Sequence, residues 1–167
     1  FERVAGVIVE GFQGANVDFL PKEYAQNLKK WCEENNALLT FDEVQSGFGR
    51  TGKMWAFEHF DIVPDIMCLG KALSGMLPIS AALTRPEIMD VFVPGEMTST
   101  FTGNPLSCAA ALANIDIFEK ENLVEKAAAL ESVMMPAAKE LVDKYDFVGR
   151  ATGKGAIIGL GVTKPGS

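Results

Sequence analysis

The chain has 167 residues, 48% of them hydrophobic, which is enough to bury a core, and it carries a formal net charge of −7. That charge argues against nucleic acid and anionic membrane surfaces as partners. No apolar run reaches the roughly 18 residues that span a bilayer, and the three widely spaced cysteines fit neither a disulfide framework nor a metal site, so we expect the cytoplasm or an organelle matrix.

The first quarter of the chain predicts a strand, a helix and a second strand. A run rich in β-branched residues at 5–9 predicts a buried strand. Apolar residues at helical spacing follow Pro21 and continue to Asn35, which ends the predicted helix. The apolar run at 37–41 predicts the second strand. Because a helix connects them, the two strands should lie parallel in one sheet.

Two more strands and two helices are predicted further along. The strands lie at 66–69 and 79–83, and the connection between them is too short for a helical crossover, so this pair should be antiparallel. An alanine-rich helix is expected from 105 to about 119, followed by a longer one at about 123–145. The apolar run at 156–160 then starts a new strand. The pattern predicts an α/β fold with a mostly parallel sheet and one antiparallel strand.

Two ionisable residues follow predicted strands. Asp42 comes directly after the strand at 37–41, where open α/β sheets place their ligands, although a capping or turn aspartate is an equally ordinary interpretation. Lys71 stands among apolar residues and glycines. A desolvated lysine has a lowered pKa and becomes a nucleophile toward carbonyl groups, and the alternative interpretation is a strand-end lysine whose amine reaches solvent.

A third cluster, Thr98-Ser99-Thr100, precedes the helix that begins at Pro105. Hydroxyls and free backbone amides beside a helix start can hold a phosphate, and they also form ordinary capping turns. An acid, a nucleophilic lysine and an anion site near the ends of strands in one sheet are what pyridoxal phosphate requires. Physical reasoning makes that cofactor a candidate without singling it out.

Five segments resemble the signature of the class III (omega) aminotransferases, a family of pyridoxal-phosphate enzymes of fold type I: Ile8–Glu10 with Gln13–Gly14, Phe41–Gly52, Pro64–Ile66, Gly70–Gly75 and Thr98–Leu106. The likeness covers nearly the whole chain. It implies the central part of the large domain of these transferases at 1–120, with helices on both faces of the sheet. It also implies a long connecting helix at 121–145 and, at 146–167, the start of a C-terminal α+β domain.

The resemblance also implies how the cofactor, pyridoxal 5'-phosphate, is held. Asp42 would pair with the pyridine nitrogen, Val44 would pack against the ring, and Gln45 would hydrogen-bond the phenolic oxygen. Lys71 would form the internal aldimine and then carry the proton between the substrate's alpha carbon and the cofactor.

Thr100, together with Ser99, would reach the cofactor phosphate of the neighbouring subunit, which implies a homodimer with shared active sites. His59, the single histidine, carries no signature role, and we interpret it as a surface or packing residue.

The implied activity is the transfer of an amino group from an amine or omega-amino acid to a keto acid through Lys71. A racemase, mutase or decarboxylase on the same scaffold stays open, because fold and lysine do not separate these reactions. Gly11 and Ala15 depart from residues common in relatives, so the substrate class is open. An inactive fragment is also considered, because the chain begins at Phe1 without a methionine and ends soon after a strand-like run.

Overall fold

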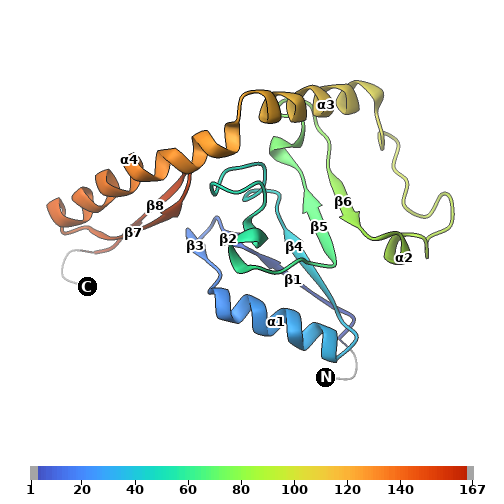
Figure 1. Ribbon diagram of the computed structural model, residues 1–167, viewed down its shortest axis with the longest axis horizontal. Helices are drawn as coiled ribbons and strands as arrows, with labels where there is room; N and C mark the ends of the chain where they lie inside the picture. Colours follow the sequence, from blue (N-terminus) through green and yellow to red (C-terminus); the bar gives the residue numbers. More distant parts are fainter. Residues whose placement is uncertain (1–3, 165–167) are drawn as a thin grey trace.

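A four-stranded sheet forms the centre of the molecule (Figure 1), whose computed structural model describes residues 4–164. The strand order is β1-β4-β5-β6, with bounds Gly6–Glu10, Leu38–Asp42, Ile66–Leu69 and Ala81–Thr84. β4 pairs in parallel with β1 and β5, and β6 pairs antiparallel with β5. The predicted sheet, mostly parallel with one antiparallel strand, is confirmed.

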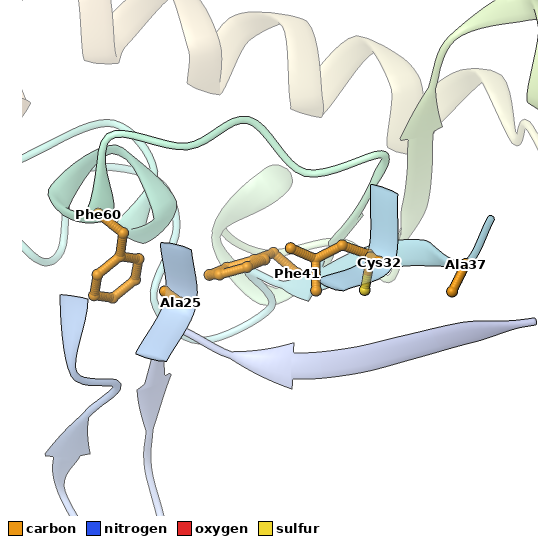
Figure 2. Packing of buried hydrophobic residues seen from close by; sticks show 6 residues of the cluster. Ala25, Cys32, Ala37, Phe41 and Phe60 are labelled. Carbon is orange, nitrogen blue, oxygen red and sulfur yellow. The ribbon is translucent and has the colours of Figure 1, made fainter. Parts of the chain in front are cut away.

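Helix α1 (Lys22–Glu34) covers β4 and builds one core. It begins after Pro21, whose extended backbone at φ −61° suits the residue before a helix. Ala25 and Cys32 of α1 pack with Leu39 and Phe41 of β4, all fully buried (Figure 2). The 3-10 helix η1 (Ala56–Phe60) closes this core at one end. Burial of alternate residues along β4 leaves Asp42, at its carboxyl end, only half-buried.

A second core lies under helix α3 (Pro105–Lys120). Leu69, at the end of β5, packs there with Phe48, Leu73 and Ala111. Leu73 belongs to a short 3-10 helix, η2 (Lys71–Leu73), that follows β5 at once. This core therefore anchors both sides of the turn that carries Lys71.

The chain after α3 forms a long helix and a hairpin (Figure 1). Helix α4 spans Leu123–Lys144 without interruption at Pro136, and β7 (Val148–Lys154) pairs antiparallel with β8 (Ile157–Val162) against it. These elements match the predicted helix and strand, and they add β7. The division of the chain into domains stays a prediction, and its outermost residues, 1–3 and 165–167, lie outside the described residues.

Besides β7 and the 3-10 helices η1 and η2, three short elements were missed by sequence reasoning. β2 (Phe12–Gln13) and β3 (Asp18–Phe19) pair antiparallel, and α2 (Pro86–Met89) follows β6. Each is too short to show a periodicity. Within residues 4–164, no helix is both long and apolar enough to cross a membrane, and no cluster of potential metal ligands forms.

Candidate functional site

The carboxyl ends of the parallel strands bring the predicted site residues to one edge of the sheet. Pairing across β1, β4 and β5 places Asp42 between Glu10 and Cys68. Lys71 follows three residues after Cys68, just beyond the end of β5. Open α/β sheets place ligands at this edge.

The loop after β4 is shaped by its first residue. Asp42 Oδ1 accepts a hydrogen bond of 2.9 Å from the Val44 backbone N–H, which closes a tight aspartate turn. Val44 then lies against the strand that leads to the lysine, since a Cβ on Gly70 would be only 3.3 Å from Val44 Cγ1. A glycine at 70 lets the backbone before Lys71 pass close to Val44.

Lys71 adopts an uncommon backbone conformation, with φ at +42°. Non-glycine residues adopt positive φ at a cost, and such strain persists where the surroundings impose it. Here the Leu73 N–H donates to Gly70 O at 2.9 Å. From α3, the Asn114 amide donates to the carbonyl oxygens of Ala72 at 2.6 Å and Leu73 at 3.3 Å. The turn is held from both ends, so the lysine leaves the sheet in a defined direction.

The Lys71 amine projects into open space toward Gln45, with Nζ 3.5 Å from Gln45 Oε1. Of the two interpretations left open for Lys71, the structure favours the strand-end lysine that reaches solvent: among the described residues, Lys71 is exposed and faces pockets instead of a core. Gly14 leaves room for the Gln45 amide, since a Cβ there would lie 2.5 Å from both Oε1 and Nε2.

Three pockets are lined in part by Lys71, and two of them also contain other predicted site residues or their neighbours. One, of about 550 Å³, is lined by Val44, Lys71, Ser99 and Gly103 among others, and the other, of about 450 Å³, by Gln45, Lys71 and apolar residues of β8. The structure therefore brings the lysine, Val44, Gln45 and Ser99 together.

Asp42 and Thr100 are placed differently. Asp42 lines a different pocket, of about 480 Å³, together with Glu10 and Asp18. Its hydrogen bond to the Val44 N–H connects it to the pocket that Val44 and Lys71 line. Thr100 is exposed and does not line the pockets that contain Lys71.

The hydroxyl cluster before α3 is partly closed on itself. Thr102 Oγ1 accepts from the Ser99 N–H at 3.0 Å and lies 2.6 Å from Ser99 Oγ. The cap of α3 is Asn104, whose Oδ1 accepts from Leu106 N and Ser107 N, so the helix start does not need the hydroxyls. A phosphate-binding role for Ser99 and Thr100 stays a prediction.

Sequence reasoning missed two residues that shape the site. Asn114 holds the turn after the lysine, and no local pattern distinguishes it within an alanine-rich helix. Glu43 is almost completely buried, 1% exposed, and accepts three hydrogen bonds. Burial raises the pKa of Glu43, and the donors at Ala56, Ser46 and Phe57 act in the opposite direction.

His59 is a packing residue, as interpreted from the sequence. Its Nε2 lies 3.0 Å from Thr51 Oγ1, and its ring meets Phe19 edge-on. Burial lowers its pKa, and the nearby cations Lys154 and Lys53 lower it further. It lies away from the pockets that Lys71 lines.

Comparison with known proteins gives a consistent result. The family model for class-III aminotransferases matches residues 1–167. The acetylornithine aminotransferase of Methanopyrus kandleri is 43% identical over 162 residues, covering 96% of this chain and 41% of that protein. The ornithine aminotransferase of Oceanobacillus iheyensis is 43% identical over 166 residues, covering 98% and 41%.

A solved structure is also similar. The ornithine aminotransferase from Toxoplasma gondii, described with partial occupancy of PLP at its active site, superposes with a TM-score of 0.92 at 36% identity, covering 96% of this chain and 38% of that one. The chain spans 38–41% of the length of these three proteins.

Proposed function

Because this chain belongs to the class III aminotransferase family, we propose that it forms the cofactor-binding centre of a pyridoxal-phosphate-dependent aminotransferase. The enzyme moves an amino group from an amine or omega-amino acid to a keto acid in the cytoplasm or an organelle matrix. The observation that carries the proposal is the position of Lys71 at the end of β5, 3.5 Å from Gln45 and in one pocket with Val44.

The residues present fit pyridoxal phosphate. The Lys71 amine has no carboxylate partner among residues 4–164, its pocket is open, and the glycines at 14 and 70 keep the surrounding space clear. Lys71 would hold the cofactor covalently, and Val44 would lie on one face of the ring. Gln45 would meet the phenolic oxygen of the cofactor and Asp42 its ring nitrogen. A hydroxyl of Ser99 or Thr100 from the neighbouring subunit would meet the phosphate. When bound, the cofactor accepts electrons from a bond broken at the substrate's alpha carbon.

Each side chain has a distinct task. Asp42 uses Oδ1 for the Val44 N–H, so Oδ2 is available to accept from a protonated ring nitrogen and to keep it charged. Gln45 accepts from Lys71 through Oε1, which leaves its Nε2–H group to donate to an oxygen. Lys71, once its amine is free, takes the proton from the substrate's alpha carbon and returns it at the next step.

The active form is proposed to be a homodimer. The segment 91–101 is exposed throughout and carries large apolar side chains: Val91, Phe92, Val93, Met97 and Phe101. Apolar side chains gathered in one exposed segment are typical of an interface. A second copy that covers this segment would bring Ser99 and Thr100 next to the neighbour's cofactor.

The experiment combines trapping with turnover. Borohydride reduction of the cofactor-loaded full-length enzyme should leave a phosphopyridoxyl group on the peptide that contains Lys71. Lys71→Ala should lose the label and all transamination, whereas Lys53→Ala, a control at a lysine outside the three pockets that Lys71 lines, should keep them. A label on Lys53 or Lys154 would contradict the proposal.

The substrates for the turnover assay are the amino donors named in similar proteins. Ornithine, acetylornithine and 4-aminobutyrate, named in the relatives, are offered with a keto acid, and amino-group transfer to the keto acid is the expected result. A leucine/methionine racemase of Thermococcus litoralis is 41% identical over 164 residues, covering 98% of this chain and 37% of that protein. Inversion of an amino acid without consumption of the keto acid would therefore replace the transaminase proposal with a racemase.

A further inference from the structure

The carboxylate that follows Asp42 points away from the site and into the protein. Glu43 is 1% exposed, whereas Asp42 and Val44 on either side are half-buried and Gln45 is exposed. We propose that Glu43 is a positioning residue, which fixes the loop 42–46 against η1 so that Asp42, Val44 and Gln45 keep their places around Lys71. The inference rests on the proposed function, since it assigns a role in that same site.

The Glu43 side chain joins two parts of the chain that are distant in sequence. Its Oε2 accepts from Ser46 Oγ at 2.7 Å and from the Ala56 N–H at 3.0 Å. Its Oε1 accepts from the Phe57 N–H at 3.0 Å. Three donors on two oxygens match a carboxylate, which accepts only, and hydrogen bonds to a charged acceptor are the strong ones. The loop is thus attached to the first turn of η1.

The Glu43 backbone is held as firmly. Its N–H donates to Cys68 O at 3.0 Å, which ties the loop to the last part of β5, and its carbonyl accepts from the Gly47 N–H at 3.0 Å. A Cβ on Gly47 would lie 2.8 Å from that carbonyl and 3.0 Å from the Trp55 ring, so the loop is closely packed from outside as well. Glu43 is therefore the point from which its neighbours project.

A direct chemical role for Glu43 does not fit its surroundings. The side chain lines none of the pockets that contain Lys71, and its two oxygens are occupied by donors within the protein. Catalytic groups must be held within about 0.5 Å of the productive geometry, and a displacement of roughly 1 Å can cost about a hundredfold in rate. Glu43 acts through its neighbours by preventing such a displacement.

The test uses Glu43→Gln in the full-length holoenzyme. Glutamine keeps the shape but turns one acceptor oxygen into an NH₂ donor, which faces an N–H of Ala56 or Phe57 or the Ser46 hydroxyl. The matched control is Glu58→Gln: Glu58 Oε1 accepts from the Trp55 N–H at 2.7 Å, so it supports the start of the same short helix. Its negative charge is a minor cause of the raised pKa of Glu43, so its loss favours the Glu43 carboxylate.

We expect Glu43→Gln to lower kcat by about tenfold or more, with a smaller change in KM, and to change the circular dichroism of the bound cofactor, which reports the placement of the ring. Glu58→Gln should keep kcat and the dichroism of the bound cofactor within about twofold of the original enzyme. Ser46→Ala removes one hydrogen-bond donor to Glu43 and keeps the Glu43 charge. It should change kcat and the dichroism in the same direction as Glu43→Gln, but by less.

A purely structural role for Glu43 would give a different result. Glu43→Gln would then lower the thermal midpoint while kcat and the dichroism of the folded protein matched those of Glu58→Gln, and the inference would be overturned. If Glu43→Gln does not fold, Ser46→Ala decides between the two outcomes in the same way. Failure of the original enzyme to transaminate or to be trapped at Lys71 would instead overturn the proposed function, so the two failures are distinguishable.

Discussion

Asn114 donates a hydrogen bond of 2.6 Å to the carbonyl oxygen of Ala72, the residue directly after Lys71. A second bond, of 3.3 Å, goes from the same amide nitrogen to Leu73 O. The positive φ of Lys71 is thus stabilised by a residue on α3 that lies 42 positions after Ala72 in the chain. The direction in which the Lys71 side chain leaves the backbone therefore depends on how α3 packs, and no local sequence feature could indicate that packing.

Replacing Asn114 should loosen this turn. In Asn114→Ala, two carbonyl oxygens lose their donor, so we expect a loss of roughly 1–3 kcal/mol in the free energy of unfolding. Hydrogen exchange should accelerate at the backbone amides of 71–75. Asp116→Asn is the control, because Asp116 is exposed on the same helix and, among residues 4–164, forms an ion pair with Lys120 alone. Denaturant titration measures the free energy of unfolding, and mass spectrometry measures the exchange rates. Equal exchange rates at 71–75 in the two variants would count against the role of Asn114.

Asp42→Asn should impair chemistry more than folding. Asparagine Oδ1 can still accept from the Val44 N–H, so the free energy of unfolding should change by less than about 1 kcal/mol. The charge that keeps the ring nitrogen protonated is lost. We expect kcat to fall at least about a hundredfold, equivalent to ~2.7 kcal/mol of transition-state stabilisation. Steady-state kinetics with a parallel denaturation curve checks this, and near-normal turnover would remove Asp42 from the mechanism.

Gly14→Ala should displace the Gln45 amide. The new Cβ would lie 2.5 Å from Gln45 Oε1 and Nε2, and because that amide is the exposed end of a flexible side chain, it should swing away at little cost in stability. Its contact with Lys71 would be lost, and cofactor affinity should fall by about tenfold. The control is Gly14→Ala in a Gln45→Ala background, where the clash no longer exists. An equal effect in both backgrounds would show that Gly14 acts independently of Gln45.

Asp65 lies directly before β5, at the end of this strand opposite to the candidate site. It accepts from Lys29 Nζ at 3.1 Å, the Leu39 N–H at 2.9 Å and Arg85 Nη2 at 3.2 Å, and its side chain is 9% exposed. Asp65→Asn leaves Lys29 without its buried partner, so we expect a loss of roughly 3 kcal/mol in the free energy of unfolding. Asp61→Asn, which removes an exposed pair with Lys22, should shift the thermal midpoint far less.

The same residue predicts a pH dependence. Burial alone would raise the pKa of Asp65, but the Leu39 N–H, Lys29 and Arg85 outweigh it and hold the pKa below its usual range. An acid whose pKa is lowered by folding stabilises the native state above its unfolded pKa, near 3.8, and this stabilisation is lost as the pH falls through the folded value. Denaturation curves from pH 6 to pH 2 should therefore converge for the original protein and Asp65→Asn at the acid end. Parallel curves would contradict the assignment.

The pairing of β1 with β4 and of β5 with β6, with the direction of each pair, could be predicted from the sequence, whereas the parallel pairing of β4 with β5 came from the structure. The apolar runs at 37–41 and 66–69 identify β4 and β5, and the helical pattern before the first of these requires a parallel crossover from β1. Asp42 and Lys71 follow the ends of those strands, so parallel pairing alone brings them to one edge. These inferences depend on periodicity and on connection length, which are properties of neighbouring residues.

The contacts that aim these side chains could only be decided by the tertiary structure. Nothing beside Glu43 in the sequence indicates that its carboxylate turns inward to the amides of Ala56 and Phe57, and nothing beside Gly14 indicates that the Gln45 amide occupies the space where its side chain would lie. The sequence left the exposure of Lys71 open for the same reason. Local composition determined which residues stand at the ends of strands, whereas their burial and direction depend on packing between segments that are distant in sequence and meet only when the chain folds.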